Sequence, residues 1–251
     1  MSDGYRAVVF DFFGTLTSAV TRGPAHARVA EILGCEPHRF TDMLNRSYRA
    51  RLRGEYGTPS AALRRIATEL GQRPGPAAVA AATHVRREAI GADITLRAGA
   101  VWTLWKIRAG GLRTALVTDC TDELPDLVAG LPIAAHLDAT VFSAELGVAK
   151  PDPVMFLTAS RRLGVAPEQC LYVGDGGGRE LSGARRAGMT AVRLAAHDLA
   201  EHLTFDPEPA WDGPTVADLR DVPDLALAGR LDAGRPAAAR PTATDGAILA
   251  R

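Results

Sequence analysis

The chain has 251 residues, 47% of them hydrophobic and 23% charged, which suits one large domain or a domain that carries an insertion. Its 29 basic and 29 acidic side chains cancel, which argues against a nucleic-acid binder that relies on bulk positive charge. Three widely spaced cysteines argue against a disulfide framework or a zinc site. Without a signal-peptide pattern or an apolar run of membrane-spanning length, we expect a cytoplasmic protein that does not contact membranes.

The pattern of apolar residues predicts strands alternating with helices, interrupted by one long helical block. A short apolar run at 6–10 predicts the first buried strand, and residues 23–92 then carry apolar positions at helical spacing with Pro or Gly between segments. Further strands are predicted at 113–118, 139–142, 170–173 and 190–194, further helices at 100–108, 123–129, 153–163 and 179–187, and one more strand–helix unit ends near Leu227.

Strands that alternate with helices predict an α/β fold, because right-handed crossovers place successive strands in one parallel sheet. We therefore expect a doubly wound, Rossmann-like core made of residues 1–18 and 93–228. The helical block, residues 19–92, is predicted to be a cap inserted after the first strand. Residues 229–251, rich in Ala, Arg, Pro and Thr, are predicted to form a disordered tail.

Polar residues follow the predicted strands. In an open parallel sheet the ligand binds beyond the carboxyl ends of the strands, so these residues are expected to meet at one edge. Each acid alone has an ordinary explanation as a turn former or a helix cap. Together they predict a site that comprises Asp11, Gly14 and Thr15 after the first strand, Thr118 and Asp119 after the second, Lys150 (one of two lysines), and Asp175 and Glu180 after the strand at 170–173.

Four segments that carry these residues resemble, in order, the four motifs of the haloacid dehalogenase superfamily of hydrolases. The segments are VVFDFFGTLT, ALVTD, AKPDPVMF and YVGDGGGRELSGARRAGM. The resemblance covers about residues 8–194, and the helical block lies where part of the superfamily has a helical cap, between the first and second motifs.

The resemblance implies a hydrolase in which Asp11 is the nucleophile and forms a covalent aspartyl intermediate. It implies Mg²⁺ held by Asp11, Asp175 and the backbone carbonyl of Phe13. Thr118 and Lys150 would stabilise the transferring group. Glu180 would support the metal ligands or their waters. Substrate or phosphate contacts would come from Gly14, Thr15 and Asp119, with backbone N–H groups of the turn adding donors.

Phe13 departs from the family pattern. In family phosphatases an acid at this position protonates the leaving oxygen, a contribution of roughly 10²–10⁴-fold that Phe13 cannot make. We favour a Mg²⁺-dependent, phosphatase-like hydrolase acting on a small phosphorylated metabolite. One alternative is a 2-haloacid dehalogenase, which has an aromatic residue here and no Mg²⁺, although Thr118-Asp119 and Gly174-Asp175 fit it less well. The other is a catalytically weak binding protein on the same fold, suggested by Arg179-Glu180 in place of the commoner Asn-Asp.

Other polar residues of the helical block give weaker signals. The arginines of RSYRARLRG, residues 46–53, are interpreted as a solvated helix face rather than as substrate ligands. His26, His38 and His84 are not spaced like metal ligands. Each is nevertheless a candidate for the proton donor that is missing because Phe13 stands in place of an acid. Substrate identity and oligomeric state have no signal in the sequence.

Overall fold

A computed structural model of the chain describes residues 4–229. Within this range six parallel strands form one sheet in the order β3-β2-β1-β4-β5-β6, which confirms the predicted α/β class with a doubly wound parallel sheet. The strands are β1 (Ala7–Phe10), β2 (Arg113–Thr118), β3 (Ala139–Phe142), β4 (Cys170–Gly174), β5 (Thr190–Leu194) and β6 (Thr215–Val216). The predicted tail lies outside the described residues, apart from Gly229.

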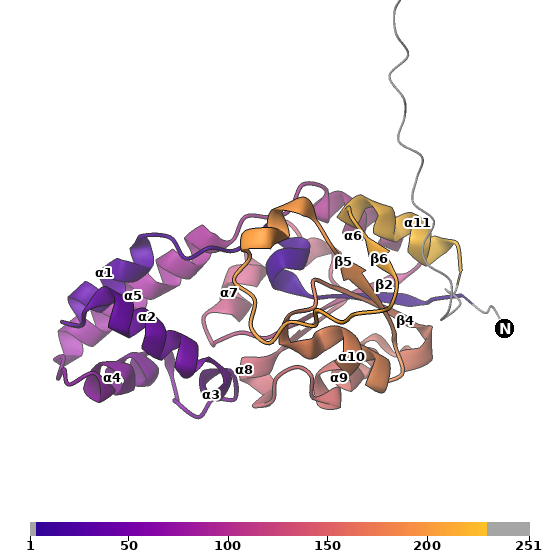
Figure 1. The fold of residues 1–251 in the computed structure, drawn as a ribbon. Coiled ribbons are helices and arrows are strands. Elements are labelled where there is room, and N and C mark those ends of the chain that lie inside the picture. The colour runs from indigo at the N-terminus through magenta and orange to yellow at the C-terminus, as the bar shows by residue number, and fades with distance from the viewer. Residues whose placement is uncertain (1–3, 230–251) are drawn as a thin grey trace, which may run out of the picture.

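Both faces of the sheet are covered, which explains why its central strands are continuous apolar runs such as AVVF and CLYVG. Val8 and Phe10 of β1 point into one core, and Ala7 and Val9 point into the other. The first core is closed by α6 (Ala100–Ala109), α7 (Leu124–Ala129) and α11 (Val222–Leu227), and the second by α9 (Pro153–Leu163) and α10 (Glu180–Arg186). Figure 1 shows α6 and α11 on one side of the sheet and α9 and α10 on the other.

Six α-helices lie between β1 and β2 in the chain, and the first five gather beside the sheet, where we call them the helical lobe (Figure 1). They pack around a core of their own that includes Phe40, Leu44 and Ile66. Glu36 and Thr58 cap α2 and α4 with their side chains, and a proline follows each cap. The lobe comprises α1 (Ala25–Ile32), α2 (Pro37–Arg46), α3 (Tyr48–Leu52), α4 (Pro59–Glu69) and α5 (Pro76–Asp93).

The lobe touches the sheet domain through α3 and α5. The Tyr48 ring stacks on Phe205 with 4.1 Å between ring centroids, and Arg49 forms an ion pair with Asp206. Deeper in the junction, Arg86 Nε lies 2.9 Å from Glu123 Oε1, with both side chains buried. None of the helices in the described part of the chain is both long enough and apolar enough to cross a bilayer.

Candidate active site

The carboxyl ends of β1, β2 and β4 bring the predicted residues together around one small cavity. Asp11 follows β1, Thr118 ends β2, and Asp175 directly follows β4. Because these three strands are neighbours in the sheet, their ends lie side by side. We call this space, about 60 Å³, the catalytic cavity; it is lined by Asp11, Phe13, Tyr48, Thr118, Asp119, Lys150, Asp175, Gly177, Gly178, Glu180, His202, Leu203, Thr204 and Phe205.

Asp11 is held by groups on both of its carboxylate oxygens. Lys150 Nζ lies 2.6 Å from Asp11 Oδ1, and the Thr15 hydroxyl donates to Asp11 Oδ2 across 3.1 Å. Lys150 is itself buried, and burial alone would lower its pKa. The neighbouring charges of Asp11 and Glu180 outweigh burial and raise the pKa of Lys150 well above its usual value. The lysine is therefore a fixed cation beside a fully oriented carboxylate.

Glu180 holds Lys150 from the other side. Its Oε2 lies 2.5 Å from Lys150 Nζ and accepts the Tyr172 hydroxyl at 2.8 Å, while its Oε1 accepts the Gly176 N–H at 2.9 Å. A Cβ on Gly174 would lie 2.1 Å from Glu180 Oε1, so only glycine leaves room for this carboxylate. With both oxygens engaged, Glu180 is placed to orient Lys150.

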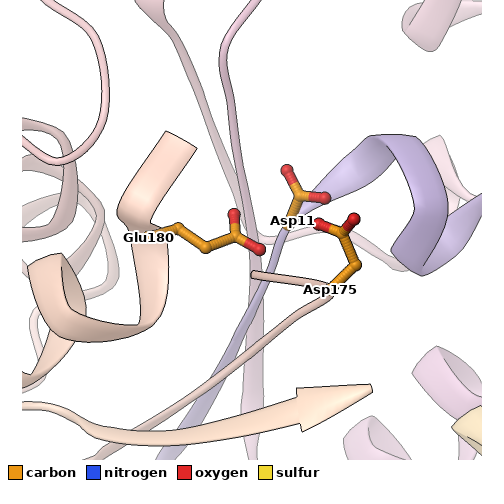
Figure 2. A group of neighbouring side chains, drawn as sticks. All are labelled: Asp11, Asp175 and Glu180. Carbon is orange, nitrogen blue, oxygen red and sulfur yellow. The ribbon is translucent and has the colours of Figure 1, made fainter. Parts of the chain in front are cut away.

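Asp11, Asp175 and Glu180 form a compact acidic group that fits a divalent cation. One carboxylate oxygen from each lies within 4.8 Å of the others, and Figure 2 shows the three side chains pointing toward one another. Burial, and then the charge of Asp11, raises the pKa of Asp175 and of Glu180. Three carboxylates face one lysine, an excess of negative charge that a cation with oxygen ligands would neutralise. Asp11 and Asp175 of the predicted ligand set belong to this acidic group, and the part of the Phe13 carbonyl stays a prediction.

The second strand contributes Thr118 and Asp119. Thr118 is fully buried against the cavity, and its Oγ1 lies 3.5 Å from the Asp119 carbonyl oxygen. Asp119 Oδ1 accepts the Lys150 backbone N–H at 2.9 Å, which ties the lysine loop to the end of β2. Burial raises the pKa of Asp119 to about 6, against the opposing charge of Lys150.

Gly14 and Thr15 lie beside the cavity but do not line it. The Gly14 N–H donates to Thr17 Oγ1 at 3.0 Å, and the Thr15 hydroxyl is used by Asp11. Gly14 has φ +78°, and a Cβ there would lie 2.7 Å from His202 Nε2. The structure thus gives these residues a part in shaping the turn and holding Asp11, and their contacts with a substrate stay a prediction.

The model of the haloacid dehalogenase-like hydrolase family matches residues 5–188, which is 184 of the 251 residues. The chain belongs to this family of hydrolases. Glyceraldehyde 3-phosphate phosphatase from Methanopyrus kandleri is 37% identical over 134 residues, 53% of this chain and 55% of that protein. Phosphoserine phosphatase from Thermus thermophilus is 38% identical over 120 residues, 47% of this chain and 46% of that one. The chain thus spans about half the length of these curated relatives.

Among solved structures, L-2-haloacid dehalogenase from Xanthobacter autotrophicus has a similar fold, with a TM-score of 0.64 and 23% identity over 90% of this chain and 100% of that chain. This similarity extends through the helical lobe as well as the sheet domain. At that identity it shows a shared fold.

His202 is a residue of this hydrolase's cavity that the sequence did not single out. It follows β5 in a long irregular loop, and its side chain is 4% exposed. His202 Nδ1 accepts the Val20 N–H at 2.8 Å, so in the neutral ring the hydrogen sits on Nε2, which lies 3.7 Å from Asp175 Oδ2. The ring is therefore held as an N–H donor at the cavity.

None of the three lobe histidines considered as proton donors lines the catalytic cavity. His26 is buried with its Nε2 2.7 Å from Asp93 Oδ2. The side chains of His38 and His84 are 75% and 74% exposed and lie beside glutamates on the lobe surface. His202, from the sheet domain, was not among these candidates but lines the cavity together with Phe13.

Proposed function

We propose that this hydrolase is a Mg²⁺-dependent phosphatase that acts on a small phosphorylated metabolite through a covalent intermediate on Asp11. The observation that carries the proposal is the buried group of Asp11, Asp175 and Glu180 beside Lys150, because it suits both a divalent cation and an anionic substrate. Relatives named as phosphatases support the same reaction class.

In this reaction the Asp11 carboxylate attacks phosphorus, the bond from phosphorus to the leaving oxygen breaks, and an aspartyl phosphate forms. Water then attacks the same phosphorus, which releases inorganic phosphate and regenerates Asp11. Bound Mg²⁺ would supply positive charge against the phosphoryl oxygens. Lys150 and Thr118 add a fixed cation and a hydroxyl beside the transferring group.

Phe13 shapes the substrate preference of this reaction. Its ring packs edge-on against Phe12, with centroids 4.9 Å apart, and offers no proton. His202 can donate its Nε2 hydrogen as a hydrogen bond, but adding a proton to Nδ1 would break the bond from Val20. We infer that the leaving group departs with hydrogen-bonding help and without full protonation, which favours acyl and aryl phosphates.

We also infer that the helical lobe acts as the cap of the enzyme, with boundaries near residues 19 and 92. Tyr48 of α3 lines the catalytic cavity, so the lobe closes over the site in the described conformation. Its stack on Phe205 and the Arg49–Asp206 ion pair join the lobe to the sheet domain, and both contacts would separate if the lobe swung away.

A dehalogenase is the second candidate, favoured by the aromatic Phe13. In that chemistry Asp11 displaces a halide, which needs neither a proton nor a metal ion. Without a metal ion, the three carboxylates of Asp11, Asp175 and Glu180 would face the single lysine Lys150, which favours the metal-dependent reaction. A catalytically weak binding protein is less well supported, because Asp11, Lys150 and Asp175 keep a complete and oriented arrangement.

The deciding experiment measures phosphate release from acetyl phosphate and p-nitrophenyl phosphate, and chloride release from 2-chloropropionate, each with Mg²⁺ and with EDTA. We expect phosphate release with Mg²⁺ only, and none from an Asp11→Asn control. Chloride release that persists in EDTA would assign the enzyme to dehalogenation instead, and no turnover of any substrate would favour the binding protein.

A further inference from the structure

A second cavity, of about 140 Å³, lies between the helical lobe and the sheet domain, directly behind the catalytic cavity. We call it the inner cavity. Its lobe side carries Arg22, Arg51, Arg86 and His26. The two cavities share a wall made of Phe13, Tyr48, Asp119, His202, Leu203 and Phe205. A substrate whose reacting group lies at Asp11 would therefore extend toward these arginines.

Two of the arginines have only neutral partners. Arg51 is 7% exposed and donates to Ser47 Oγ at 3.2 Å and to the Leu44 carbonyl at 2.9 Å. Arg22 donates to Asn45 Oδ1 at 2.6 Å. Within residues 4–229 neither guanidinium has a carboxylate at ion-pair distance.

The arginines also act on one another. Burial, and then the charge of Arg86, lowers the pKa of Arg51 to about 10, and the same two causes lower the pKa of Arg22. These shifts indicate positive charge that is withdrawn from water and only partly balanced, by Asp93 for Arg22 and by Glu123 for Arg51. Holding these guanidinium charges away from water costs free energy, and an anion bound in the cavity would offset that cost.

The local charge balance indicates what kind of anion fits. Arg86 is paired with Glu123 at 2.9 Å, and Asp93 lies 2.7 Å from His26 on the same side of the cavity. Arg51 and Arg22 are therefore the guanidinium groups of this cavity that have no carboxylate at ion-pair distance among residues 4–229. Asp119, on the wall shared with the catalytic cavity, accepts the Lys150 backbone N–H.

From this arrangement we propose that the inner cavity binds a carboxylate of the substrate, through Arg51 and Arg22, so that the enzyme selects phosphate esters that also carry a carboxylate. Asp93 and Asp119 also line this cavity, so a monoanion meets less repulsion there than a second phosphate, which carries nearly two negative charges. The planar guanidinium fork matches a carboxylate with two parallel hydrogen bonds. The proposal rests on the phosphatase function and specifies its substrate class.

The test uses phosphonates, which bind but cannot be hydrolysed, so it does not depend on turnover. Phosphonoacetate and 3-phosphonopropionate are titrated calorimetrically into the Mg²⁺-loaded protein, each against the alkylphosphonate that has a methyl group in place of the carboxylate. For at least one spacer length we expect the carboxylate to tighten binding about tenfold or more. Arg51→Met should remove most of that gain, with a much smaller effect on the alkyl counterpart.

Arg46→Met is the matched control, because Arg46 is exposed at the end of α2 and should leave the gain intact. If Arg51→Met does not fold, Arg22→Met makes the same test from the loop before α1. Equal binding of every carboxylate and alkyl pair by the parent protein, or a gain that survives both arginine variants, would overturn the proposal. If the carboxylate tightens binding but the protein hydrolyses no phosphate ester, the phosphatase function would be overturned and the carboxylate site would still be supported.

Discussion

The catalytic cavity and the inner cavity share a wall but differ in their charged side chains. The first is acidic, with Asp11, Asp175 and Glu180 gathered around Lys150. The second is basic, with Arg22, Arg51 and Arg86 on its lobe side. The acids come from the sheet domain, Asp11 and Asp175 at strand ends and Glu180 at the start of α10, whereas the arginines come from residues 22–86. We therefore expect the reaction and the choice of substrate to depend on separate parts of the chain.

This separation makes the two cavities independently testable. Changes at the acidic end should alter the rate with every substrate, because they act on the reacting group. Changes at the basic end should alter only the discrimination between substrates.

The most damaging change is expected to be Asp11→Asn. The amide is nearly the same shape but a poor nucleophile, so kcat should fall at least ~10⁴-fold on all phosphate esters. Rates are measured with p-nitrophenyl phosphate after mass spectrometry has excluded deamidation. The preference for carboxylated phosphonates should persist, and a rate within about tenfold of the parent would refute the nucleophile.

Because Phe13 offers no proton, we predict that the rate of hydrolysis depends steeply on how readily the leaving group departs unprotonated. Acetyl phosphate and p-nitrophenyl phosphate should be turned over ~10²–10⁴-fold faster than an alkyl phosphate without a carboxylate, because nothing fully protonates an alkoxide. Phe13→Asp should narrow the gap where the new carboxylate is tolerated beside Asp11. Comparable rates on alkyl and aryl esters in the parent would show that another group supplies the proton, and His202→Gln would test the nearest one.

Glu123→Gln tests the charge pair at the back of the inner cavity. Burial would raise the pKa of Glu123, but the charge of Arg86 and hydrogen bonds lower it. The charged form is therefore stabilising above the ordinary pKa, and the effect disappears as the pH falls through the lowered value. We expect the variant to lose ~3 kcal/mol of unfolding free energy at pH 7 in urea titrations. An equal loss at a pH below both values would contradict this assignment.

Asp119→Asn, on the wall shared by the two cavities, should have the opposite effect on the free energy of unfolding. Burial raises the pKa of Asp119 from 3.8 to about 6, so its ionisation costs stability as the pH rises through that interval. Without Mg²⁺, the amide should stabilise the protein at pH 8 by on the order of 3 kcal/mol and have little effect below pH 4. Destabilisation at pH 8 would show that the Asp119 carboxylate is needed to hold the Lys150 loop.

The metal site predicts a change in Mg²⁺ requirement. Asp175→Ala removes a charged oxygen ligand, so the Mg²⁺ concentration that gives half-maximal activity should rise ~10–100-fold or more. Asp126→Ala is the control, because its side chain is 72% exposed and pairs with Arg87 on the surface. An unchanged Mg²⁺ requirement in Asp175→Ala would remove this residue from the ligand set.

The sheet and the residues of the catalytic cavity that follow its strands were largely predictable from the sequence. Strands 113–118, 139–142 and 190–194 were predicted with the bounds that the structure has, because buried strands are short apolar runs with turn residues at each end. Asp11 and Asp175 follow such runs directly, so their position at one edge of the sheet follows from the parallel topology.

The inner cavity was not predictable from the sequence, because the rotation of the lobe helices decides which of their side chains line it. Arg46, Arg49 and Arg53 are exposed, as the interpretation of a solvated face required, but this was wrong for Arg51, which is buried. Nothing in RSYRARLRG marks which arginine turns inward. His202 was missed for a related reason, since its place is set by where an irregular loop returns to Val20.

The most direct test of the central claim is to trap the intermediate on Asp11. The protein is mixed with p-nitrophenyl phosphate and Mg²⁺, quenched during turnover and treated with borohydride, which reduces an acyl phosphate to an alcohol. Trypsin then releases the peptide 7–22, AVVFDFFGTLTSAVTR, in which Asp11 is the sole acidic side chain. We predict homoserine at position 11 in this peptide and not in samples treated with EDTA. Unmodified Asp11 during steady phosphate release would contradict the covalent mechanism.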